Sequence, residues 1–190
     1  MAVIPVTRVL EGTVGLFSYA AGSPALGATT AVRAAVTDNG AQQVITASIT
    51  NPAVCRNVTA TAGGTAGDIK AIQVIVAGTN IHDEAITETL PAFTVDTAGT
   101  VTGSKAFKTV TSITIPAHDG TGATTAVGTG AKLGLPYKLS RNSVLAAFLN
   151  GTKEGTDPTV TVSTSAVELN TVTLNSALDG NAVIIDLYTK

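Results

Sequence analysis

Short runs of β-branched residues, most of them bounded by glycine, proline or asparagine, recur every 10 to 15 residues along most of this chain. Threonine and valine carry two heavy atoms on Cβ, so they fit a pleated sheet and lose rotamer freedom in a helix. The chain holds 32 Thr and 21 Val among 190 residues, and no run shows helical apolar spacing over three turns. The pattern therefore predicts an all-β fold, a β-sandwich or jelly-roll-like domain.

The expected strands share alternation or a continuous apolar run, with turn residues at their ends. The run at 143–149 also fits a short helix, and we interpret it as a strand. Asp179-Gly180 predicts a hairpin between the last two runs, because both residues tolerate positive φ. The ten expected strands are Gln43–Thr50, Arg56–Ala62, Ala71–Ala77, Glu84–Leu90, Lys105–Ile115, Thr124–Leu135, Ser143–Leu149, Thr159–Thr164, Thr171–Asn175 and Asn181–Tyr188.

The first 29 residues differ from the rest of the chain. Residues 3–12 fit one strand, but residues 15–30 (GLFSYAAGSPALGATT) are small, apolar and rich in turn formers. We expect residues 1–29 to be an extended N-terminal arm that becomes ordered against a partner, and residues 30–190 to be one β-sandwich or jelly-roll-like domain. The alternative is that the arm folds onto its own domain.

Charge and hydropathy exclude several classes of protein. The net charge is −2, so no strong positive field attracts nucleic acid. The longest charge-free stretch, Gly12–Val32, contains Pro24 and four glycines and is too polar to span a bilayer. Cys55 is the only cysteine, which excludes an intramolecular disulfide, and we expect no signal peptide. Neither nucleic acid nor a membrane is expected as a partner.

Two histidine motifs are the only places where an imidazole ring lies beside carboxylates. They are His82-Asp83-Glu84 and His118-Asp119-Gly120. A metal site would need both motifs to converge, since imidazole nitrogens and carboxylate oxygens are its ligands. A glycan hydrolase would need a carboxylate pair such as Asp83 or Glu84 with Asp119. Two solvated turns explain the motifs more simply.

The remaining nucleophile and phosphate-loop candidates lack their usual surroundings. Cys55 has no glycine-rich turn beside it, so a buried, inert thiol is expected. Ser23 and Ser104 lack the Gly-x-Ser-x-Gly pattern of a nucleophile elbow. Residues 128–132 (GTGAK) lack the Gly-Lys-Ser/Thr ending of a phosphate loop, and turn glycines explain them better. We therefore expect no catalytic residue, cofactor site or metal site, and no enzymatic activity.

One long stretch of the chain resembles a module of tailed-bacteriophage virion proteins. The similarity covers Arg56–Pro136, in RNVTATAGGTAGDIKAIQVIVAGTNIHDEAITETL and in TGSKAFKTVTSITIPAHDGTGATTAVGTGAKLGLP. Its most specific part is SKAFKTVTSITIP. The resemblance implies a structural protein of the virion and carries over no functional residue.

Among virion roles, a capsid decoration protein fits the chain best. Such proteins are small, mostly β, often trimeric and supplied with an arm. The resemblance implies a virion protein, assembled in the host cytoplasm. If the chain is a decoration protein, we expect a homotrimer that binds the major capsid protein from outside the head. The alternatives are a tail or head-fibre component, and a receptor- or glycan-binding module on the virion.

Overall fold

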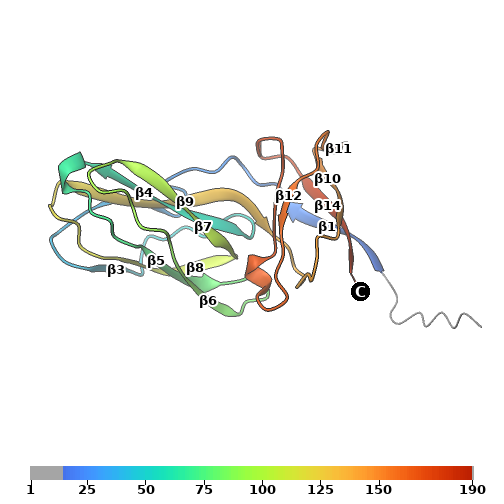
Figure 1. Cartoon of the computed structure of the whole chain (residues 1–190), viewed down its shortest axis with the longest axis horizontal. Helices are drawn as coiled ribbons and strands as arrows, with labels where there is room; N and C mark the ends of the chain where they lie inside the picture. The colour runs from blue at the N-terminus through green and yellow to red at the C-terminus, as the bar shows by residue number, and fades with distance from the viewer. Residues whose placement is uncertain (1–14, 190) are drawn as a thin grey trace, which may run out of the picture.

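The computed structural model describes residues 15–189, and strands dominate it (Figure 1). Strands hold 48% of the chain and helix 3%, which confirms the all-β prediction. No helix within residues 15–189 is long and apolar enough to cross a membrane. The elements are β1 Gly15–Gly22, β2 Arg33–Thr37, β3 Gln43–Ile45, β4 Arg56–Gly64, η1 Ala66–Asp68, β5 Ile75–Thr79, β6 Ala85–Thr89, β7 Gly99–Phe107, β8 Thr109–Ile115, β9 Ala123–Gly134, β10 Val144–Leu149, β11 Thr152–Lys153, β12 Thr159–Thr161, η2 Val167–Leu169, β13 Thr171–Thr173 and β14 Val183–Thr189.

The strands form three antiparallel sheets. Sheet A has the order β1-β14-β10-β11, and sheet C has the order β3-β8-β5-β6. Sheet B has the order β12-β13-β9-β4-β7, with β2 paired to β9. In Figure 1 most of sheet B and sheet C lie at one end of an elongated molecule, and sheet A lies at the other end together with both ends of the described chain.

Two separate clusters of buried side chains hold these sheets together. The first joins sheets B and C through residues such as Val58, Val76 and Ile113. The second lies between sheet A and the far end of sheet B, and it includes Leu133 and Ile185. The 12-residue strand β9 contributes to both clusters and so connects the two ends of the molecule.

Asn57 holds the sheet together where β9 passes from one cluster to the other. The register of β4 shifts here against both neighbours, so a bulge faces Asn57 on each side. The fully buried Asn57 side chain donates a hydrogen bond to the carbonyl of Gly103 (2.9 Å) and accepts one from the backbone N–H of Lys132 (3.0 Å). One amide group therefore satisfies backbone groups that the two bulges remove from the ladder.

Asn57→Ala is expected to lower the free energy of unfolding by about 2–4 kcal/mol, because it leaves two shielded backbone groups without partners. Urea unfolding of the purified chain measures this loss. Asn39→Ala is the matched control, since exposed Asn39 makes one local bond to the N–H of Ala41. A loss no larger than that of the control would contradict the bridging role.

Several expected strands differ from the observed ones. Lys105–Ile115 is not one strand, because the chain leaves sheet B after Phe107 and enters sheet C at Thr109. Only Gln43–Ile45 of the run 43–50 is a strand. The hairpin predicted at Asp179-Gly180 is wrong: Gly180 does take φ +86°, but β13 belongs to sheet B and β14 to sheet A. The ambiguous run at 143–149 does form a strand, β10.

The arm expected over residues 1–29 requires correction where the structure describes it. Gly15–Gly22 is strand β1, which pairs along its length with β14. Ala28 then crosses β9, where its carbonyl accepts a hydrogen bond from the N–H of Thr129 (3.1 Å). Residues 15–29 thus order against their own chain. Residues 1–14, which include the strand expected at 3–12, lie outside the described residues.

Candidate functional site

His118 is a buried structural histidine. Its Nδ1 accepts a hydrogen bond from the backbone N–H of Lys70 (3.2 Å), so Nε2 carries the proton and donates to Oγ1 of Thr125 (3.0 Å). Its own backbone N–H donates to the carboxylate of Asp38 (2.9 Å). Burial lowers the pKa of His118, and the charges of Asp38 and Asp119 oppose that shift. The ring is neutral and both its nitrogens are occupied.

Acid is expected to destabilise the fold through His118. A histidine whose pKa is lower in the folded state stabilises the fold fully above its unfolded pKa of about 6.5. That contribution is lost as the pH falls through 6.5 toward the folded pKa. Thermal unfolding between pH 7.5 and 5 should therefore show a smaller acid loss in His118→Gln than in the wild type. His82→Gln keeps His118 and serves as the control. If the melting temperature fell equally steeply with pH in all three proteins, this role of His118 would be contradicted.

His82 lies in the turn between β5 and β6, which Asn80 organises. The carboxamide oxygen of buried Asn80 accepts hydrogen bonds from the N–H groups of His82 and Glu84. The Nε2 of His82 lies 3.0 Å from the carbonyl oxygen of Pro136. Asp83 pairs with Lys108 (2.7 Å), and both of these side chains are largely exposed. This motif therefore connects a turn of sheet C to the chain after β9.

The two histidine motifs do not converge. His82 follows β5, and His118 follows β8. Strands β5 and β8 are antiparallel, so the C-terminal end of β5 lies beside the N-terminal end of β8. The C-terminal ends of the two strands are therefore separated by the length of the seven-residue β8, roughly 20 Å. Neither the metal site nor the carboxylate pair of Asp83 or Glu84 with Asp119 is assembled. Within residues 15–189, no group of three or more His, Cys, Asp or Glu side chains is placed to hold a metal ion.

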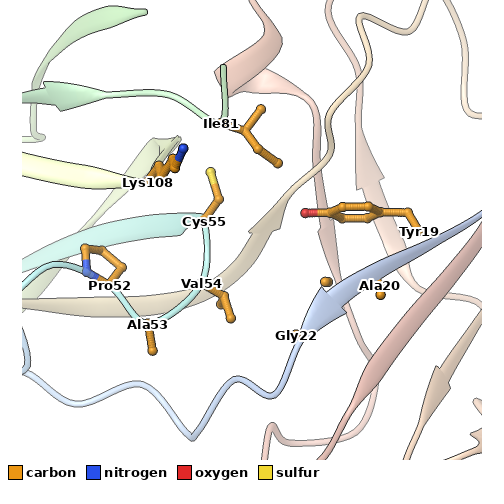
Figure 2. A pocket seen from close by; sticks show the side chains of 10 residues that line it. Tyr19, Ala20, Gly22, Pro52, Ala53, Val54, Cys55, Ile81 and Lys108 are labelled. Carbon is orange, nitrogen blue, oxygen red and sulfur yellow. The ribbon is translucent and has the colours of Figure 1, made fainter. Parts of the chain in front are cut away.

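Cys55 lies beside a cavity of about 300 Å³ between β1 and the segment that enters β4 (Figure 2). Burial raises the pKa of its thiol to about 12, against the weaker opposite effect of Lys108. Burial likewise raises the pKa of Tyr19, on the other wall of the cavity, to about 12. A thiol held protonated is a poor nucleophile.

The serine and phosphate-loop candidates are also structural. Ser23 and Ser104 are exposed, and the N–H of Ser104 donates to the carboxylate of Glu88 (2.6 Å). The expectation that the glycines of residues 128–132 lie in a turn is wrong, because these residues belong to strand β9. Gly128 permits the close crossing of Ala28, and Gly130 faces the Asn57 amide.

The outer surface of sheet A carries large apolar side chains that packing against residues 15–189 does not bury. Alternate residues on β1 and β14 pair across this surface, with Leu16 opposite Tyr188 and Ala20 opposite Ile184. Phe148 on β10 lies beside Ile184. Leu16 is 71% exposed and Ile184 is 38% exposed. We call these five residues, together with Leu145 at the β10 bulge (52% exposed), the open face of sheet A.

Few charges interrupt the open face. Asp186 lies at its centre, and its carboxylate accepts a short hydrogen bond from the hydroxyl of Ser18 (2.6 Å). Arg141 lies over the ring of Tyr188, 5.6 Å from its centroid. The opposite side of the same strands carries Ile185 and Leu187, which are fully buried in the second cluster. A sheet that is apolar on both sides, with one side left uncovered by residues 15–189, is typical of a surface that contacts another molecule.

Comparison with known protein families, curated sequences and solved structures finds no match for this chain. The sequence and the geometry above therefore carry the functional argument.

Proposed function

We propose that the chain is a non-enzymatic structural subunit of a bacteriophage virion, of the capsid decoration type, which binds the major capsid protein from outside the head. The observation that carries the proposal is the open face of sheet A. It offers large apolar side chains on a rigid four-stranded sheet, with Asp186 already satisfied by Ser18. A rigid apolar face can bind a protein surface at a low cost in conformational entropy.

The rest of the molecule supports an assembly role. Charged residues make up 13% of the chain, so few ions must be desolvated when its surfaces are buried. Both ends of the described chain lie at the sheet A end (Figure 1). Residues 1–14 directly precede β1 in the sequence, and we propose that they add to the contact with the shell. The resemblance of Arg56–Pro136 to phage virion proteins supplies the context.

Co-sedimentation with phage heads that lack this protein tests the proposal. The full chain should sediment with the heads, and a chain without residues 1–14 should bind less while keeping its circular dichroism spectrum. A larger deletion is unsuitable, because it would remove β1 from sheet A.

The alternatives predict different outcomes in the same experiment. A tail or head-fibre component would leave the heads unbound and associate with tails or fibre-attachment sites. A receptor- or glycan-binding module would bind host cells or a glycan array and would tolerate the loss of residues 1–14. Either outcome would contradict the decoration role.

A further inference from the structure

Strand β1 is a sheet edge that lacks charge and proline, and its one bulge lies near its C-terminal end, between Ala20 and Gly22. It pairs only with β14 among the described residues, so the backbone groups along its other side have no strand partner. Its sequence, GLFSYAAG, contains no charged residue and no proline across eight residues. Natural sheets normally protect such an edge with charge, proline, a bulge or a covering segment, because an open edge pairs with other strands.

The other sheet edges in residues 15–189 are short or carry charge, and these include β2 with Arg33 and β7 with Lys105. Strands β3 and β12 have three residues each, and β11 has two, one of them Lys153. Strand β6 carries Glu88, and that carboxylate accepts hydrogen bonds from the N–H groups of Ser104 and Lys105 on β7. The exception at β1 is therefore specific to one edge of one sheet.

We propose that the β1 edges of two copies of this chain pair antiparallel about a two-fold axis, joining their A sheets into one eight-stranded sheet. Pairing of one strand with itself needs a self-complementary sequence, and β1 has one. In the register centred on Ser18, exposed Leu16 lies opposite small Ala20 of the second copy, and Phe17 lies opposite Tyr19. No like charges meet across this contact, because β1 has none.

The pairing also fits the open face of sheet A. A two-fold axis perpendicular to the sheet keeps both open faces on the same side, so the dimer presents one continuous apolar surface of twice the width. The contact does not depend on the virion role, since it uses only the edge of β1. A trimer would instead require a contact elsewhere on the molecule.

Disulfide trapping tests the axis directly. In a Cys55→Ser background, Ser18→Cys places two thiols on directly opposed residues, whose Cα atoms lie about 4.5–5.5 Å apart in an antiparallel pair. That distance permits a disulfide. Ala20→Cys is the matched control, because in this register each introduced thiol lies four residues from its copy, about 13 Å along the strand. We expect oxidation to link most of the first variant and little of the second.

Light scattering of the full-length chain completes the test. We expect the wild type to be a dimer. Leu16→Lys should raise the dissociation constant of the dimer at least about tenfold. Val44→Lys, whose side chain is 60% exposed on sheet C, should leave that constant unchanged. A monomeric wild type would overturn the proposal, as would a trimer that Ser18→Cys fails to cross-link. A chain that dimerises only after removal of residues 1–14 would also overturn it, by assigning the edge to that segment.

Discussion

Gly128→Ala is expected to lower the free energy of unfolding by about 3 kcal/mol, at the upper end for inserting a methyl group into a packed site. A Cβ on Gly128 would overlap with the carbonyl oxygen of Ala28 and with the backbone of Thr29. Those atoms belong to the crossing segment that the N–H of Thr129 holds by its hydrogen bond. Backbone cannot rotate away as a flexible side chain can, so β9 and the segment must separate.

Gly99→Ala is the matched control for this prediction. Gly99 begins β7, its φ is not positive, and no atom lies within 4 Å of the position of a Cβ. We expect its urea midpoint to differ little from that of the wild type, while the midpoint of Gly128→Ala falls strongly. Similar midpoints for the two variants would mean that residues 25–29 do not cross β9 as described.

The double substitution Leu145→Lys and Ile184→Lys is expected to abolish binding to the head while leaving the fold intact. Both side chains are exposed on the open face of sheet A, so neither change removes core packing. Burying two ammonium groups against an apolar partner requires their desolvation without a counter-charge. We expect at least about a hundredfold loss of affinity, since each tenfold step costs only about 1.4 kcal/mol.

Val44→Lys with Val95→Lys is the control, because it adds the same two charges elsewhere, at side chains that are 60% and 50% exposed. Binding of head particles should survive this pair of changes, as measured by co-sedimentation at fixed ionic strength. Equal losses for both double variants would indicate a nonspecific charge effect, and no loss for either would remove sheet A from the contact.

Local alternation predicted many of the strands but missed β1 and β2, and it did not reveal which strands share a sheet. The runs at 56–62 and 124–135 match β4 and β9 closely, because β-branched residues and bounding glycines act over a few residues. The transfer of the chain between sheets at Lys108 depends on the backbone bond from its N–H to the carbonyl of Thr79. That partner is distant in sequence, so no local pattern could reveal it.

The open face could not be recognised from the sequence for a related reason. The run NAVIIDLY predicts a strand that is apolar on both sides, and nothing in it distinguishes Ile184 from Ile185. In the structure Ile185 is fully buried in the second cluster and Ile184 lies on the uncovered side. The bridging role of Asn57 could not be predicted from the sequence either, because a single buried amide that bridges two bulges has no sequence motif.

A cryo-EM reconstruction of the virion of a phage that encodes this chain tests the account most directly. The account predicts density for the all-β subunit on the outer surface of the head, with the open face of sheet A against the shell. Density found only in the tail or in fibres, or a head-bound subunit that turns sheet A toward solvent, would contradict it.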